Sequence, residues 1–207
     1  MPGLPTVQPY VLPGRDAIPA ARVPWTVDPA RAVLLVHDMQ QYFVRGLPDV
    51  VRDDLVRRVR LLRARADVLD VPVAYTAQPG GMTPLDRGLL ADVWGPGMSA
   101  TAEDRDVVAG LTPKPGDWRL TKWRYSAFVR STLLQQMRDA GRDQLVICGV
   151  YAHVGVLMTA ADAFQHDIQP FVVADAVADF SLEFHRLALD WAADRCAAVV
   201  VTDEVFA

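Results

Sequence analysis

The sequence predicts a doubly wound α/β protein whose mainly parallel six-stranded sheet is flanked by helices in a three-layer α/β/α arrangement. Six short apolar segments are typical of strands that are buried on both faces. Segments with helical periodicity alternate with them, as right-handed crossovers in a parallel sheet require. With 207 residues and a hydrophobic fraction of 51%, we expect a single domain over residues 1–207.

The first half of the chain contains an arm, two strands and one long helix. Residues 1–28 are rich in proline and lack periodicity, so we expect an arm that lies on the domain or on a partner subunit. The apolar runs at 31–38 and 71–78 predict strands. Apolar residues at helical spacing predict a helix over 49–67, with its arginines on a solvated face. Segment 79–100 is rich in glycine and proline and is expected to be a long irregular connection with a functional role.

The second half continues the alternation of strands and helices. Ser131 and Gly141 are typical of helix ends, and Ser181 is expected to cap the last helix. His166 and His185 fall within helices and are expected to face solvent or a partner. The elements predicted here are strands at 118–122, 144–150, 168–175 and 197–205, and helices at 131–141, 154–166 and 181–196.

Composition excludes several classes of protein. The formal net charge of -4 and the lack of a basic patch argue against nucleic-acid binding. The chain begins without a signal-peptide pattern and has no apolar run of membrane-spanning length, so we expect a cytoplasmic protein without membrane contact. Cys148 and Cys196 are too few for a disulfide framework or a four-cysteine zinc site and are expected to be buried.

Polar residues follow the first four predicted strands. Asp38, Gln78, Lys122 and Tyr151 stand where a ligand binds in an open α/β sheet, beyond the carboxyl ends of the strands. Each also has an ordinary structural interpretation: Asp38 could cap a turn, and Lys122 could be a solvated lysine. No glycine-rich phosphate-binding motif follows strand one, so nucleotide binding has little support. His153 is expected to be structural or orienting, because no other metal ligand lies near it in sequence.

The segment after the fourth strand has the pattern of a nucleophile elbow without a nucleophile. Strand, sharp turn and helix follow one another over 144–164, which is where a catalytic Cys or Ser commonly stands. The turn from Tyr151 to Gly155, however, contains neither residue.

Four segments resemble the isochorismatase family of the isochorismatase-like cysteine hydrolase superfamily. Asp38, Lys122 and Gly155 of this chain occupy the positions at which members of that superfamily carry their acid, their lysine and their nucleophile. The likeness covers nearly the whole chain, and within the family it is greatest to the stand-alone isochorismatases of phenazine biosynthesis. The segments are Leu34–Phe43, Thr121–Phe128, Gly149–Gly155 and Asp167–Ser181.

The resemblance implies hydrolysis of 2-amino-2-deoxyisochorismate to pyruvate and trans-2,3-dihydro-3-hydroxyanthranilate, without metal or cofactor. It also implies a homodimer, a small substrate with two carboxylates and no carrier-protein domain. Asp38 would be the general acid, and Lys122 would position it and stabilise anionic groups. The residues implied to bind the substrate's carboxylates and ring are Gln78, Arg87, Tyr151 and the backbone of Gly155, with Trp94 and Tyr125 closing the pocket.

The chemistry of a vinyl ether explains why a nucleophile is not needed. Such an ether hydrolyses after protonation of its terminal methylene carbon, so a well-placed acid suffices. A glycine at the elbow would leave room for a substrate carboxylate near backbone N–H groups. The alternatives are isochorismate as substrate, an amidase, and a non-catalytic binding protein. No residue distinguishes an amino from a hydroxyl group on the substrate ring, and the amidase would need a thiolate at the elbow.

Overall fold

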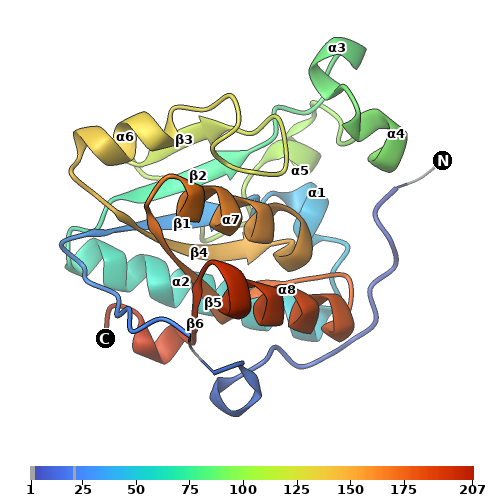
Figure 1. The fold of residues 1–207 in the computed structure, drawn as a ribbon. Helices are drawn as coiled ribbons and strands as arrows, with labels where there is room; N and C mark the ends of the chain where they lie inside the picture. Colours follow the sequence, from blue (N-terminus) through green and yellow to red (C-terminus); the bar gives the residue numbers. More distant parts are fainter. Residues whose placement is uncertain (1–2, 21) are drawn as a thin grey trace.

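The computed structural model describes residues 3–20 and 22–207 and confirms the predicted three-layer α/β/α fold. Its six strands form one parallel sheet in the order β3-β2-β1-β4-β5-β6 (Figure 1). The strand order reverses between β1 and β4, which pair directly from Ala32↔Gln144 to His37↔Gly149. The strands are β1 (Ala32–His37), β2 (Val73–Ala77), β3 (Trp118–Thr121), β4 (Gln144–Val150), β5 (Gln169–Ala178) and β6 (Ala198–Val200).

Helices cover both faces of the sheet (Figure 1). On one face, α2 packs its buried stripe against β1, β4 and β5. On the other face, α6, α7 and α8 form a second core. Because successive residues of a strand point to opposite faces of the sheet, the neighbours Leu34 and Leu35 belong to different cores. The α-helices are α1 (Gln41–Val44), α2 (Asp49–Val68), α3 (Pro84–Arg87), α4 (Leu90–Trp94), α5 (Ala102–Arg105), α6 (Leu133–Asp139), α7 (Leu157–Gln165) and α8 (Leu182–Arg195).

The segment predicted to be irregular contains two short helices. Thr83 caps α3 by accepting a hydrogen bond from the backbone N–H of Asp86, and Pro84 stands at the first helical position. Gly88 and Gly95 have φ of +52° and +67° and end α3 and α4. The two helices project from the body of the domain (Figure 1).

Several predicted boundaries differ from the structure. The last strand is shorter than expected because Thr202 turns its N–H and hydroxyl toward the carboxylate of Asp175, at 2.7 and 2.8 Å. Helix α6 begins after Thr132, although the Ser131 hydroxyl still accepts the N–H of Leu133 at 3.2 Å. The elbow helix starts with a π-helical turn over Ala152–Val156, and Ser181 caps α8 as predicted.

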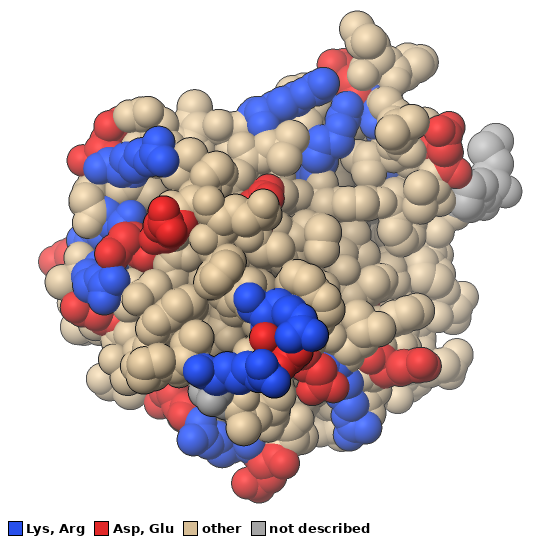
Figure 2. Space-filling view, in the orientation of Figure 1, with Lys and Arg blue, Asp and Glu red and all other residues tan. Residues whose placement is uncertain are grey.

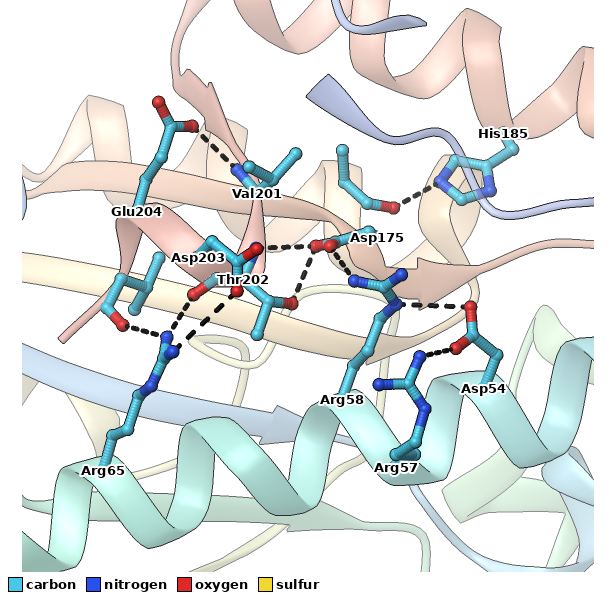
Figure 3. A network of polar contacts seen from close by, with 12 residues as sticks. Asp54, Arg57, Arg58, Arg65, Asp175, His185, Val201, Thr202, Asp203 and Glu204 are labelled. Carbon is cyan, nitrogen blue, oxygen red and sulfur yellow. Dashed lines mark hydrogen bonds and ion pairs between the residues drawn. The ribbon is translucent and has the colours of Figure 1, made fainter. Parts of the chain in front are cut away.

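The arginine-rich face of α2 is only partly solvated, contrary to the prediction. Arg58 pairs with Asp175, and Arg65 donates to the carbonyl oxygen of Thr202 at 2.6 Å (Figure 3). Arg63 is buried and bonds Asp117 at 2.6 Å. These arginines connect α2 to the sheet because a long side chain can bury its stem and still reach an acceptor.

Acidic and basic side chains are interspersed over the face shown in Figure 2.

Within 3–20 and 22–207, no helix combines the length and hydropathy that a membrane span requires. Both cysteines are buried, as expected, and neither forms a disulfide.

The arm is fastened to the domain through a buried histidine. His185 is fully buried, which corrects the expectation of an exposed side chain. Its Nε2 donates to the carbonyl of Ala174 at 3.0 Å, so its Nδ1 accepts from the Tyr10 hydroxyl at 3.2 Å. That hydroxyl also accepts the N–H of Asp179 at 2.8 Å. Residues 3–20 therefore lie on the domain itself.

Burial lowers the pKa of His185 to about 4, so we predict a loss of stability in mild acid. The unfolded chain takes up the proton near pH 6.5, whereas the folded chain does so only near the lowered value. The free energy of unfolding should therefore fall by about 3 kcal/mol as the pH drops from the unfolded to the folded pKa of His185. Unfolding followed from pH 7 to 4.5 should show a smaller drop in Tm for His185→Gln than for the unsubstituted chain. A variant of the exposed His166, His166→Gln, is the control; equal drops in all three proteins would contradict the prediction.

Candidate functional site

All eight residues proposed from the sequence line one pocket. The pocket lies beyond the carboxyl ends of the strands, where the order reverses between β1 and β4. The residues brought together there are Asp38, Gln78, Arg87, Trp94, Lys122, Tyr125, Tyr151 and Gly155.

An ion pair between Asp38 and Lys122 forms the centre of the pocket. The Lys122 Nζ lies 2.8 Å from Oδ2 of Asp38, and both side chains are almost fully buried. The Thr76 hydroxyl donates to Oδ1 of Asp38 at 2.6 Å and accepts the backbone N–H of Asp38 at 3.0 Å. Asp38 has φ of +49°, a conformation that Asp adopts more readily than most residues. Its carboxylate caps no helix, because the N-cap of α1 is Gln40.

The surroundings of Asp38 hold it as a carboxylate. Burial alone would raise its pKa, but the charge of Lys122 and the hydrogen bonds from Lys122 and Thr76 outweigh burial, so the pKa lies below its ordinary value. The Nδ1 atom of the neighbouring His37 lies 3.9 Å from Oδ2. Because burial lowers the pKa of His37 to about 4, that imidazole is neutral near pH 7.

Two arginines give the pocket an excess of positive charge. Arg87 donates to the carbonyl of Gly95 at 3.0 Å and to Oε1 of Gln78 at 3.1 Å. Arg124 donates to the carbonyls of Asp86 and Trp123. Within the described part of the chain, neither guanidinium pairs with a carboxylate. Since the charges of Asp38 and Lys122 cancel, the four charged side chains that line the pocket leave a net charge of +2.

Aromatic side chains enclose the pocket. The Trp94 Nε1–H donates to the Tyr125 hydroxyl at 2.8 Å, which joins α4 to the segment after β3. The Tyr151 hydroxyl donates to the carbonyl of Phe43 at 2.6 Å, and burial raises its pKa. Its proton is therefore engaged, and Tyr151 offers a substrate its ring and its hydroxyl lone pairs. The rings of Tyr151 and Phe180 lie 4.1 Å apart.

At the elbow, Gly155 has a different neighbour from the one expected. A Cβ atom at this position would overlap Cε1 of His37 and lie 2.8 Å from its Nε2. The space beside Gly155 is thus filled by imidazole on that side. The reason for glycine here is the close approach of His37 as well as any approach of a substrate.

Three residues of the site were not proposed from the sequence. Thr76 is a polar residue inside an apolar strand, two positions before Gln78. Arg124 lies within the aromatic segment that contains Lys122, and its lack of a carboxylate partner is visible only in the structure. His37 precedes Asp38 at the end of β1, but the sequence does not reveal that its ring reaches Gly155.

His153, expected to be structural or orienting, is held in place by Asp179. Its backbone N–H donates to Asp179 at 2.6 Å, and its Nδ1 lies 2.7 Å from the same carboxylate. Its ring stacks on Phe184 at a centroid distance of 4.5 Å. Residues 3–20 and 22–207 contain no group of three or more His, Cys, Asp or Glu side chains that could hold a metal ion.

Neither cysteine can serve as the elbow nucleophile. Cys148 lies inside β4, where burial raises the pKa of its thiol. Cys196 follows α8, and burial raises its pKa to about 11. A reactive cysteine needs the opposite, an accessible thiol with a lowered pKa.

Comparison with known proteins gives one consistent assignment. The family described as Isochorismatase domain matches residues 32–204. The chain is 59% identical over 205 residues to the phenazine biosynthesis protein PhzD of Pseudomonas fluorescens, covering 99% of both chains. It is 47% identical over 204 residues to enterobactin synthase component B of Escherichia coli, covering 98% of this chain and 72% of that protein.

A solved structure has the same fold. The cysteine hydrolase of Pseudomonas syringae pv. phaseolicola superposes with a TM-score of 0.80 at 24% identity, covering 91% of this chain and 95% of that one. At that identity the likeness concerns the fold alone.

We predict that Lys122→Met raises the pKa of Asp38, because burial is then opposed only by His37 and by the hydrogen bond from Thr76, and no longer by the charge and hydrogen bond of Lys122. A ¹³C NMR titration of the Asp38 carboxyl carbon, assigned with Asp38→Asn, measures the change. Tm should also fall, since removing one partner of a buried ion pair costs about 3–5 kcal/mol. Lys114→Met, which removes an exposed lysine paired with Asp67, is the control. An unchanged or lower pKa of Asp38 would show that Lys122 does not govern it.

Proposed function

The chain belongs to the isochorismatase family, and we propose that it hydrolyses the vinyl ether of 2-amino-2-deoxyisochorismate. The products are pyruvate and trans-2,3-dihydro-3-hydroxyanthranilate. One observation carries the proposal: a buried Asp38–Lys122 pair faces a pocket with two guanidinium groups that have no carboxylate partner among the described residues. A substrate with two carboxylates supplies the charge that this pocket lacks.

The general acid in this mechanism is Asp38. Its carboxyl proton goes to the terminal methylene carbon of the enol, which gives an oxocarbenium ion. Water adds to the oxocarbenium carbon and returns a proton to the Asp38 carboxylate. The hemiketal then breaks its bond to the ring oxygen, which takes the hydroxyl proton, and pyruvate and the ring alcohol leave. The water that is consumed regenerates the acid. No covalent intermediate with the protein forms, because water itself adds to the oxocarbenium carbon.

Substrate binding reconciles this role with the ionised state of Asp38. Lys122 favours the carboxylate in the free protein, yet an acid must hold its proton. Two substrate carboxylates place negative charge beside Asp38 and exclude water, and both effects raise its pKa. Arg87, with Gln78, binds one carboxylate, and Arg124 is positioned to bind the other.

The choice of substrate within the family rests on the comparisons. The chain is 59% identical to the phenazine protein and 47% identical to the enterobactin protein. This difference favours the aminated substrate over isochorismate, which would give 2,3-dihydro-2,3-dihydroxybenzoate and pyruvate. An amidase on this fold would need a thiolate at the elbow, where this chain has Gly155.

We predict that Asp38→Ala lowers kcat for pyruvate release by about 10² to 10⁴, because the reaction loses its proton donor. Asp53→Asn, on the exposed face of α2, is the control and should keep full activity. Pyruvate release is measured with a lactate dehydrogenase couple, and kcat should fall as the pH rises because Asp38 must be protonated. The ratio of kcat/KM for the aminated substrate to that for isochorismate tests the substrate assignment. Normal turnover by Asp38→Ala contradicts the mechanism, and no pyruvate from either substrate would favour a binding protein.

For the assembly we propose a homodimer, as the resemblance implies. Large apolar side chains on the outer face of α8 support this proposal, with Leu187 and Trp191 exposed by 50% and 43%. Sedimentation equilibrium should give twice the chain mass, and Leu187→Glu with Trp191→Glu should give the mass of one chain. A single-chain mass for the unsubstituted protein would refute the dimer.

We also propose a cytoplasmic location. Both cysteines are free thiols, a state that a reducing compartment preserves. Recovery of the protein in the periplasmic or culture fraction of its host would count against this location.

A further inference from the structure

The imidazole of His37 lies at the base of the pocket, between the acid and the elbow. It is fully buried, and Asp38 follows it directly in the chain. On its other side it contacts Gly155, in the turn that leads into α7. The His37 side chain therefore lies next to both Asp38 and the elbow residue Gly155.

Residue 37 lies against the glycines at both ends of the motif Gly149–Gly155, with its ring beside Gly155 and its backbone beside Gly149. A Cβ at Gly155 would overlap the His37 ring, as described above. A Cβ at Gly149 would overlap the backbone carbonyl of His37, and Gly149 has φ of +112°, which strongly favours glycine. His37 and Gly149 are register partners in the parallel pairing of β1 with β4. Only the glycine at 155 therefore depends on the imidazole ring, whereas the glycine at 149 depends on the backbone of residue 37 and on its own φ.

The hydrogen bond of His37 explains why an imidazole stands here. Its Nδ1 lies 2.7 Å from the carbonyl oxygen of Val150, the last residue of β4. Because a carbonyl can only accept, Nδ1 carries the proton. The other ring nitrogen, Nε2, is buried on the side of the Tyr125 carbonyl and forms no hydrogen bond of good geometry within the described residues. A buried polar atom without a partner is destabilising, so a residue that only filled space would be expected to be apolar.

We propose that His37 is the positioning residue of this site. Its ring occupies the volume that a side chain at the elbow would need, and its Nδ1–H fixes the carbonyl at which the elbow begins. Together these contacts hold Asp38 and the Tyr151–Gly155 turn in one geometry. This proposal rests on the proposed function for its catalytic part, whereas its steric part is independent of any activity.

Two substitutions separate the two contacts. His37→Asn keeps an N–H close to the position of Nδ1 but removes the two imidazole atoms that lie nearest to a Cβ at 155, and leaves the backbone oxygen of Tyr125 at 3.2 Å. His37→Leu fills the space without the hydrogen bond. Each is combined with Gly155→Ala, and Tm, kcat and KM are measured for all combinations. Gly46→Ala is the matched glycine control, because a Cβ there has no neighbour within 4 Å.

The expected result is a coupling between positions 37 and 155. Gly155→Ala should lower Tm by roughly 4–10 °C in the presence of His37 or His37→Leu, and by much less with His37→Asn. His37→Leu should lower kcat by roughly 10-fold to 100-fold with little change in KM, because Arg87 and Arg124 still bind substrate. His37→Asn should keep most of kcat, and His166→Asn all of it.

Different outcomes overturn different parts of the proposal. An equal loss of Tm on Gly155→Ala in all three backgrounds would refute the steric role. An unchanged kcat in His37→Leu, or an equal loss in His37→Leu and His37→Asn, would refute the positioning role. If the unsubstituted protein released no pyruvate, the proposed function would fail, while the Tm measurements would still decide the steric role.

Discussion

The buried ion pair of Asp38 and Lys122 is the interaction on which the rest of the site depends. Two opposite charges at 2.8 Å have lost most of their water, so they are stable only with good geometry and further hydrogen bonds. The hydroxyl of Thr76 supplies one such bond. The three residues follow or belong to β1, β2 and β3, so the pair forms only when these neighbouring strands are in their correct register.

The reversal of strand order explains why a pocket exists beside this pair. Beyond β1 and β4 the connecting segments leave toward opposite faces of the sheet, which opens a crevice at the carboxyl ends. The crevice would be wider without His37, whose ring lies between β1 and the elbow. The fold thus provides the opening, and the ring of His37 fills part of it beside Gly155.

The sequence predicted the parts of this structure that depend on local pattern. Apolar runs located the strands, and their parallel arrangement placed Asp38, Gln78, Lys122 and Tyr151 at one edge of the sheet. Contacts between distant segments could not be read in this way: the burial of His185 depends on the arm, and the burial of Arg63 on Asp117. The short helices α3 and α4 were missed because each is about one turn long, too short to show periodicity.

The projecting helices α3 and α4 have a consequence for how such a protein can change over evolution. They carry Arg87 and Trp94 into the pocket, yet Leu85 and Leu89 on them are more than 80% exposed. Asp38, the proposed proton donor, lies by contrast at the closely packed sheet edge. Substitutions in the projecting segment can therefore alter which molecule is bound at little cost to the core. The part of the pocket that α3 and α4 supply can therefore vary more freely than the part that the strand ends supply.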